Sequence, residues 1–179
     1  MDHFENIIST LFEAEGYWVR RSFKVNLRKD EKRQIGKHSI PRPEIDLLAF
    51  DFSKNNVIAL EAKSFLDSPG VNLEQLKEKH DVPMGRYKLF TSERYRDVVF
   101  SRLLSDLIEN GMANLSTKIT LGLAAGKIYR NQSEHIRNFM LSKTWFFWSP
   151  EDIKHKVTAL AKRGHENDPA IIAAKILMR

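Results

Sequence analysis

The sequence lacks cysteine altogether, and this absence excludes several kinds of site. Without thiols the chain has no disulfide scaffold, no thiolate zinc site and no cysteine nucleophile. It also lacks a long apolar segment, because no hydrophobic run approaches the ~20 residues of a membrane-spanning helix. The opening MDHFENIIST is acidic and amphipathic, which is not the pattern of a secretory signal peptide. We therefore expect a soluble, cytoplasmic protein with no membrane partner.

Internal repeats and low-complexity tracts are absent as well. The chain has 179 residues, of which 42% are hydrophobic and 29% are charged. That composition argues against disorder, because enough apolar surface is available to offset the loss of chain entropy. The length is sufficient for one domain with a buried core.

Positive charge is concentrated in one short segment. The formal net charge is +6, with 29 Lys and Arg residues against 23 Asp and Glu residues. Residues 20–42 hold nine basic and two acidic residues, or +7, so the rest of the chain sums to −1. Such a concentration favours a polyanionic partner such as nucleic acid, while a solvated basic loop is the alternative.

The hydrophobic pattern predicts alternating helices and strands. Apolar residues at helical spacing predict a helix over 2–15, and aromatic and β-branched residues predict a strand over 17–25. Residues 26–43 are predicted to be a long basic loop or the tip of a hairpin. The remaining predicted strands are 44–52, 56–63 and 118–130, and residues 144–148 are predicted to be either a buried strand or a turn in the core. The remaining predicted helices are 72–80, 92–111, 133–141, one from 149 onward, and 168–178. This order is typical of a mixed α/β domain with a helical tail.

The two strands joined by the turn at 53–56 carry the residues best suited to metal binding or catalysis. Residues two apart on a strand share a face, so Glu44 and Asp46 project the same way from the first strand. Glu61 and Lys63 likewise share one side of the second strand. Because the turn is short, we expect an antiparallel hairpin that brings Asp46 near Glu61, with Lys63 beside them.

Charged residues in a strand most often mark its solvated face. Both strands are otherwise strongly apolar, as in IDLLAF and VIALEA, which is typical of central strands covered on both sides. Unpaired charge is unfavourable there, and neighbouring carboxylates repel unless a cation lies between them. Oxygen ligands with room for water suit Mg²⁺ or Mn²⁺, and a nearby lysine completes a site for metal-assisted attack of water on a phosphodiester.

The motifs P-E-I-D at 43–46 and E-A-K at 61–63 resemble those of the PD-(D/E)xK nuclease superfamily, whose members have the restriction-endonuclease-like fold. The sequence is especially similar to branches that write the first motif E-I-D-L. It also resembles the archaeal Holliday-junction resolvases in its run of helix, glycine-aromatic pair at 16–17 and strand. The likeness spans roughly residues 4–80.

This resemblance implies both a fold and an activity. The fold is a mixed central sheet flanked by helices over residues 1–148, with a helical extension over 149–179 packed on or beside it. The activity is that of a Mg²⁺- or Mn²⁺-dependent DNA nuclease, more specifically an endonuclease, that hydrolyses phosphodiester bonds by metal-activated water in restriction, recombination or repair. The DNA would be double-stranded or branched. Independently of the resemblance, the apolar residues of the tail helices predict a face that either covers the core or joins two copies in a homodimer.

Carried over residue by residue, the resemblance implies the following roles. Asp46 and Glu61 bind the divalent metal, with the backbone carbonyl of Ala62 as a third ligand. Lys63 orients or helps to activate the attacking water and offsets charge at the scissile phosphate. Glu5 matches a helix glutamate that some branches use at the site.

Two further residues have open roles. Glu44 binds a second metal or forms a salt bridge to a nearby base. The proline of the motif, Pro43, precedes Glu44 rather than Asp46, two positions earlier than in the superfamily's usual pattern. Gln75 resembles the glutamine that follows the lysine motif in RecB-type exonucleases, but their tyrosine four residues later is Lys79 here, which argues against an exonuclease.

The basic segment joins the first strand to the motif strands, so it begins and ends near the proposed site. We expect it to hold a phosphate backbone through contacts that add salt dependence rather than sequence recognition. Its basic residues are Arg20, Arg21, Lys24, Arg28, Lys29, Lys32, Arg33, Lys37 and Arg42. No base-reading module, such as a zinc finger or a basic zipper, is visible in the sequence.

Two other functions remain open from the sequence. One is a nucleic-acid-binding module that keeps the nuclease fold without catalysis, against which the intact set of Asp46, Glu61 and Lys63 argues. The other is a basic interaction protein with no nucleic-acid role, which predicts an exposed apolar patch in place of an acidic pocket beside basic loops.

Overall fold

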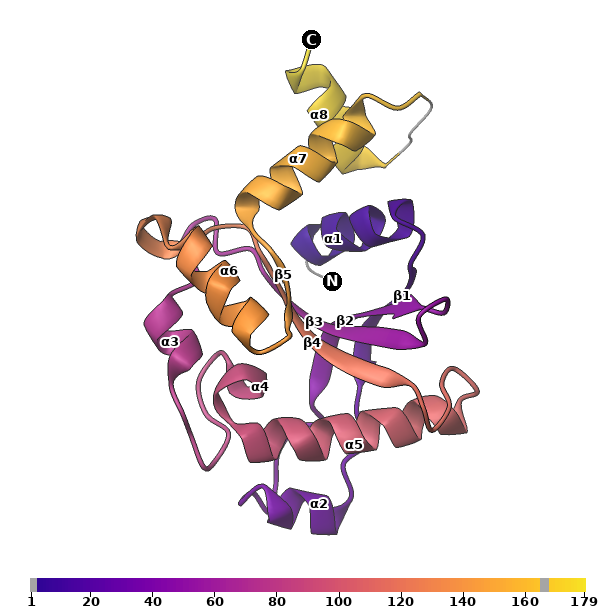
Figure 1. Cartoon of the computed structure of the whole chain (residues 1–179), viewed down its shortest axis with the longest axis vertical. Helices are drawn as coiled ribbons and strands as arrows, with labels where there is room; N and C mark the ends of the chain where they lie inside the picture. Colours follow the sequence, from indigo (N-terminus) through magenta and orange to yellow (C-terminus); the bar gives the residue numbers. More distant parts are fainter. Residues whose placement is uncertain (1–2, 165–167) are drawn as a thin grey trace.

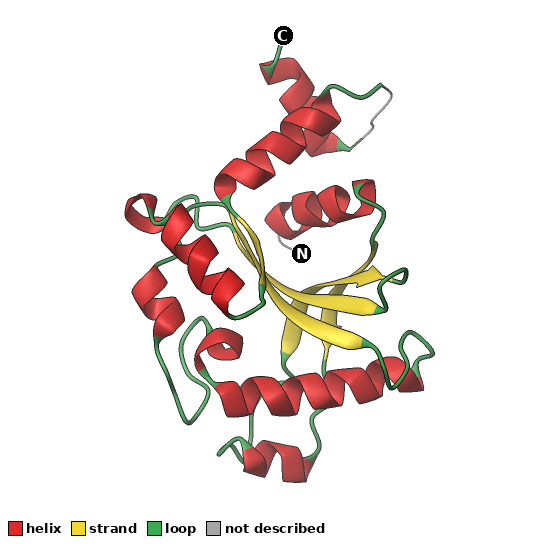
Figure 2. Cartoon of the chain, viewed as in Figure 1, coloured by secondary structure: helices red, strands yellow, loops and turns green. Residues whose placement is uncertain are grey.

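The computed structural model describes residues 3–164 and 168–179, which form a five-stranded sheet with helices on both faces (Figure 1, Figure 2). The strands lie side by side in chain order; the first three are antiparallel, and the last three are parallel. They are β1 (Trp18–Lys24), β2 (Glu44–Asp51), β3 (Asn56–Lys63), β4 (Lys118–Ala125) and β5 (Phe146–Trp148). The predicted α/β class and mixed sheet are confirmed.

The helices account for each helix predicted from the sequence. They are α1 (His3–Ala14), α2 (Lys29–Gln34), α3 (Leu73–Lys77), α4 (Lys88–Thr91), α5 (Glu93–Glu109), α6 (Ser133–Ser142), α7 (Pro150–Ala161) and α8 (Pro169–Leu177), with a 3₁₀ turn η1 at Tyr129–Asn131. Residue 2, at the start of the first predicted helix, lies outside the described residues. The strand predicted over 118–130 ends at Ala125, because η1 follows it.

The prediction of a loop or hairpin tip over residues 26–43 is wrong in part, because α2 lies within this segment. The backbone N–H of Arg28, the N-cap residue, donates to the carboxylate of Glu31 at 2.7 Å. Acidic residues in the first turn and basic residues in the last suit the helix dipole. Gly36 then leaves the helix with a φ of +71°, a conformation that favours glycine. The helix was missed because the segment has few apolar residues, although the charged residues at its two ends and Gly36 after it are typical helix-end signals.

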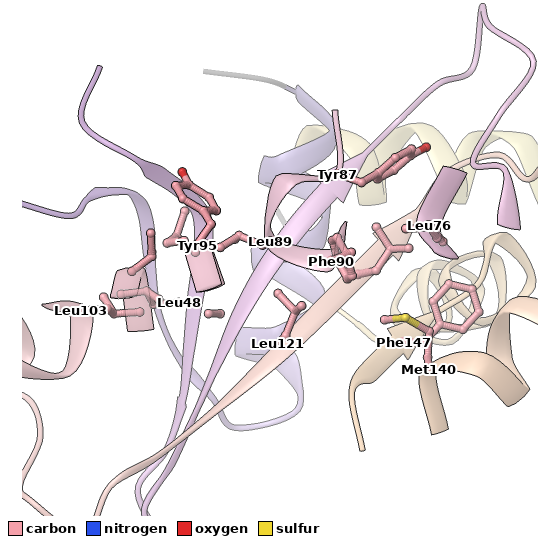
Figure 3. Close-up of a cluster of buried hydrophobic side chains, with 14 of the residues drawn as sticks. Leu48, Leu76, Tyr87, Leu89, Phe90, Tyr95, Leu103, Leu121, Met140 and Phe147 are labelled. Carbon is pink, nitrogen blue, oxygen red and sulfur yellow. The ribbon is translucent and has the colours of Figure 1, made fainter. Parts of the chain in front are cut away.

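Two hydrophobic clusters lie on opposite faces of the sheet. On one face, α1 packs against β2 and β3 (Figure 1). Ile58, Leu60 and Ala62 of β3 point into that cluster, as the alternation predicts. On the other face, α4 and α5 pack against the sheet, and Figure 3 shows Tyr95 and Leu103 of α5 with Leu48 of β2 in this second cluster. Both central strands are therefore covered on both sides, and Glu61 and Lys63 project toward the α4–α5 side.

The C-terminal helices pack beside α1. Ser149 caps α7 by accepting a hydrogen bond from the N–H of Asp152, and Pro150 occupies the first helical position as predicted. The ring of Trp148 stacks on Phe12 of α1 with centroids 4.2 Å apart. α8 packs on α7 and buries Ile171 in the α1 cluster. Residues 165–167 of the predicted extension lie outside the described residues. In the part of the chain that the structure describes, no helix combines the length and hydrophobicity needed to span a membrane.

Candidate active site

The candidate site lies where β2 and β3 separate. The two strands pair as far as Leu47 and Leu60. Beyond that pair, Oδ2 of Asp46 accepts a hydrogen bond of 2.8 Å from the backbone N–H of Ala62. β3 remains paired with β4 as far as Lys63. The carboxylate of Asp46 is thus fixed against the backbone of β3 at the point where β2 diverges from it.

Asp46, Glu61 and Lys63, here called the hairpin cluster, converge as the sequence predicts. The Nζ atom of Lys63 lies 2.7 Å from Oε2 of Glu61 and 3.5 Å from Oδ2 of Asp46. All three side chains are largely buried, with 14–20% of their surfaces exposed. One ammonium therefore lies between two carboxylates from neighbouring strands.

The burial and mutual contacts of the hairpin cluster shift the pKa values of Glu61 and Lys63. Burial is the strongest influence on Glu61 and raises its pKa; Lys63 opposes this rise, and the charge of Asp46 adds to it. Burial alone would lower the pKa of Lys63, but Glu61 and Asp46 outweigh it and raise the pKa above its ordinary value. Lys63 is therefore an ammonium at neutral pH. Because it is a single positive charge shared by two carboxylates, the cluster can accommodate further positive charge.

A pocket of about 410 Å³ opens beside Glu61, which forms part of its lining. Its walls come from two segments far apart in the sequence, residues 37–45 and 83–95. The residues that precede these two segments, Gly36 and Val82, lie close together, because an added Cβ at Gly36 would be 3.3 Å from the Val82 side chain. The basic residues of the pocket are Lys37, Arg42, Arg86 and Lys88. Glu61 therefore belongs both to the hairpin cluster and to the lining of this pocket.

None of the four basic side chains of this pocket forms an ion pair within residues 3–164 and 168–179. The Nη1 atom of Arg42 donates to the side chain of Asn26 at 3.3 Å, and the guanidinium of Arg86 lies 5.7 Å from the ring centre of Phe65. These contacts are with neutral groups. The carboxylates of Glu44 and Glu61 line the same pocket, and Lys88 interacts electrostatically with Glu61. Four basic and two acidic side chains give the lining a formal charge of +2.

Tyr95 supplies a hydroxyl to the pocket lining. The residue is only 7% exposed, and Figure 3 shows its hydroxyl pointing away from the apolar cluster. Burial, together with the charge of Glu61, raises the pKa of Tyr95 to about 12, so the hydroxyl stays protonated. No hydrogen bond of this hydroxyl occurs among the described residues. It is a hydrogen-bond donor available to a ligand.

The structure places three other predicted residues outside the hairpin cluster. Glu5 lies half-buried in the first turn of α1, the helix that packs on the opposite face of the sheet. Glu44 lines the pocket and forms a salt bridge of 3.8 Å with Lys24, which is the second of its two predicted roles. Gln75 is exposed on α3 and does not line the pocket.

The predicted phosphate-binding residues occupy three separate locations. Arg20, Arg21 and Lys24 lie on the edge strand β1, where the side chain of Arg21 donates to that of Asn6 on α1. Lys37 and Arg42 line the pocket. α2 and its N-cap carry Arg28, Lys29, Lys32 and Arg33. Only the second location adjoins the hairpin cluster.

Helix α2 is attached to α5 by buried charges that the sequence pattern does not reveal. Nε and Nη2 of Arg102 donate to the carboxylate of Glu31 at 2.8–3.2 Å. Nη1 of Arg102 also lies 3.8 Å from Asp106, which accepts the backbone N–H of Asn26 at 2.9 Å. We call Glu31, Arg102 and Asp106 the α2 network. The only local signal for it is a charged pair at positions i and i+4 beside the apolar stripe of α5.

The donor chemistry decides which metal suits the site. Within the described residues, no group of three or more His, Asp or Glu side chains gathers as a metal site. The candidate ligands are the two carboxylates of Asp46 and Glu61 and the carbonyl of Ala62. A small set of hard oxygen atoms fits Mg²⁺, which usually keeps several waters and binds through one or two carboxylates together with substrate phosphates. It does not resemble a closed zinc or calcium cage.

Compared with protein-family models, curated proteins and solved structures, the chain has no significant match. Its function is therefore inferred from the arrangement of its own residues.

Proposed function

We propose that the protein is a divalent-metal-dependent DNA nuclease with a restriction-endonuclease-like fold. The observation that carries the proposal is the convergence of Asp46 and Glu61 on Lys63 beside a pocket whose lining has a formal charge of +2. Acidic metal ligands and basic phosphate contacts are the two requirements of hydrolysis at a polyanion. The mixed sheet with helices on both faces supports the proposed fold.

Asp46 and Glu61 would hold a divalent cation, with Ala62 supplying its carbonyl. Such a cation polarises a phosphoryl oxygen and lowers the pKa of bound water. The protein's own contribution is to fix the two carboxylates, Asp46 through the Ala62 N–H and Glu61 through its place on the central strand β3. Because both groups are already ordered, little reorganisation is needed when the site is used.

Lys63 carries positive charge to the reacting phosphate. Its raised pKa keeps it protonated, so it acts as a hydrogen-bond donor and a charge and not as a general base. An ammonium held beside a phosphate stabilises the negative charge that develops during hydrolysis. Of the roles expected from the sequence, we therefore propose that Lys63 orients the attacking water and offsets charge at the phosphate, and does not take a proton from the water.

The proposal is tested with supercoiled, linear and branched DNA, each incubated with Mg²⁺, Mn²⁺ or EDTA. We expect cleavage with either metal and none with EDTA. Asp46→Asn, Glu61→Gln and Lys63→Met should each reduce the rate by about 10²–10³-fold, the usual effect of removing one electrostatic group. Asp97→Asn and Lys143→Met make the same changes of charge at exposed sites and serve as matched controls.

Cleavage in EDTA, or cleavage unchanged by all three site variants, would contradict the mechanism. Metal-independent binding of DNA without cleavage of any substrate would favour the non-catalytic binding module instead. Thermal unfolding of each variant shows whether a lost activity reflects a lost fold.

A further inference from the structure

The pocket beside the hairpin cluster holds more positive charge than one internal phosphate requires. Lys37, Arg42, Arg86 and Lys88 line it together with two carboxylates, Glu44 and Glu61, so the formal charge of the lining is +2. An internal phosphodiester carries one negative charge, whereas a terminal phosphate monoester carries about −1.5 to −2 at pH 7. A lining with a formal charge of +2 is therefore better matched to a terminal phosphate.

The shape of the pocket points to the same ligand. Its volume of about 410 Å³ is near the lower end of the ~300–1,000 Å³ typical of small-ligand sites. Two separate segments wall it, 37–45 on one side and 83–95 on the other. Such a pocket suits one nucleotide at the end of a strand, because a continuous duplex would have to lie outside it.

Tyr95 adds a hydrogen-bond donor to the same pocket. It is one of the lining residues, and no hydrogen bond of its hydroxyl occurs among the described residues. The hydroxyl is not itself fully buried, since the fully buried hydroxyls without a partner in this part of the chain are those of Tyr87 and Ser92, and it is therefore open to a ligand in the pocket. Phosphate oxygens are strong acceptors, and they would meet this hydroxyl in the same pocket as the four cations.

We propose that this pocket binds the terminal phosphate of a DNA strand end, so that phosphorylated ends are the preferred substrates. The cleavage part of this inference rests on the proposed nuclease function. Because Glu61 belongs both to the pocket and to the hairpin cluster, a strand end held in the pocket places its neighbouring phosphodiester beside Asp46 and Lys63. This changes the expected mode from cutting within a strand to cutting next to its end.

The chemical step is hydrolysis at that neighbouring phosphodiester. The oxygen of water bonds to phosphorus, the bond from phosphorus to one sugar oxygen breaks, and that sugar oxygen receives a proton. One water is consumed, and the terminal nucleotide or a short fragment leaves. No oxidant, reductant or further co-reactant is required.

Binding is measured in EDTA, so that the result does not depend on cleavage. Fluorescence anisotropy compares oligonucleotides of one sequence that carry a 5′-phosphate, a 3′-phosphate or hydroxyl groups at both ends. We expect one phosphorylated form to bind at least about tenfold more tightly than the hydroxyl form. The arm that gains affinity identifies which end is recognised, and free inorganic phosphate should compete.

Charge-matched variants assign this preference to the pocket. Arg86→Met with Lys88→Met should abolish the preference, and Lys37→Met with Arg42→Met, on the opposite wall, should do the same. Lys143→Met with Lys154→Met removes the same two charges from exposed positions outside the pocket and should leave the preference intact. Having a pair on each wall keeps the test decisive if one variant fails to fold.

The outcomes separate this inference from the proposed function. Equal affinity for phosphorylated and hydroxyl ends, or a preference unchanged by both pocket pairs, overturns the inference. Metal-dependent cutting of covalently closed circles as fast as of linear DNA also overturns it but leaves the nuclease proposal standing. A pocket-dependent preference for phosphorylated ends without cleavage of any DNA supports the inference and contradicts the nuclease proposal.

Discussion

The hairpin cluster and the α2 network contain the same charges, two carboxylates and one cation, yet they differ in how fully those charges are satisfied. Arg102 meets Glu31 through three hydrogen bonds, and Glu31 and Asp106 each accept a backbone N–H as well. Lys63 instead offers one ammonium to two carboxylates at unequal distances.

The difference appears in the protonation of the glutamates. Burial alone would raise the pKa of Glu31, but hydrogen bonds from Arg102 and from the backbone of Arg28 outweigh it and lower the pKa. In Glu61 burial prevails and the pKa rises. A charged group saturated by planar, bidentate donors is typical of a structural role. An incompletely neutralised pair of carboxylates is typical of a site that receives a cation or a substrate.

The largest expected effect on stability comes from breaking the α2 network. Arg102→Met leaves two buried carboxylates without their cation, which should lower the free energy of unfolding by about 3 kcal/mol. For a chain of this length that corresponds to a fall in melting temperature of roughly 6–12 °C. Thermal unfolding by circular dichroism measures it. Arg94→Met, an exposed position on the same helix, is the control, and equal melting temperatures for the two variants would contradict the structural role.

Removing a cation from the α2 network should lower stability, whereas adding a divalent cation to the hairpin cluster should raise it. Mg²⁺ at 100 times its dissociation constant should stabilise the wild type by about 2.7 kcal/mol, or roughly 5–10 °C in melting temperature. Asp46→Asn and Glu61→Gln should lose this gain, and Glu31→Gln should keep it. A shift that survives in both hairpin variants would place the metal elsewhere in the protein.

The smallest effect, and the one that compares the two clusters most directly, is the dependence of stability on pH. The lowered pKa of Glu31 gives stability that is present above its unfolded-state pKa of about 4.3 and is lost as the pH falls through the lower folded-state pKa. The raised pKa of Glu61 acts in the other direction, because its ionisation above about pH 4.3 costs stability in the folded state.

Glu31→Gln should therefore become more stable relative to wild type as the pH falls below about 4.3. Glu61→Gln should become less stable relative to wild type as the pH falls from neutral toward that value. Urea unfolding across this range measures both differences. Trends of the same sign in the two variants would show that the clusters do not differ as the structure indicates.

The hairpin was predictable because its information is local. Alternation along 44–51 and 56–63 determines which side chains share a face, and the short turn determines the pairing. Together these two features are enough to bring Asp46, Glu61 and Lys63 to one place. The strongly apolar runs around these charged residues also indicate central strands.

The pocket walls and the α2 network could not be predicted in this way, because they depend on contacts between distant segments. Arg86, Lys88 and Tyr95 meet residues 37–45 only through the packing of α4 and α5 on the sheet. A proline and a glycine at 83 and 85 mark a turn, but nothing in the sequence shows what that turn approaches. The α2 helix is different, since its acidic start, basic end and following glycine were readable signals that its low hydrophobicity obscured.

The position of the candidate ligands on a single hairpin has a consequence for how the protein folds. A hairpin closes a short loop and forms within about 1–10 μs, whereas the pocket needs segments some forty residues apart to meet. Asp46 and Glu61 are therefore expected to approach one another early, before the walls that would contact a strand end are in place. The carboxylates of the hairpin cluster would then come together before the basic side chains of the pocket surround Glu61.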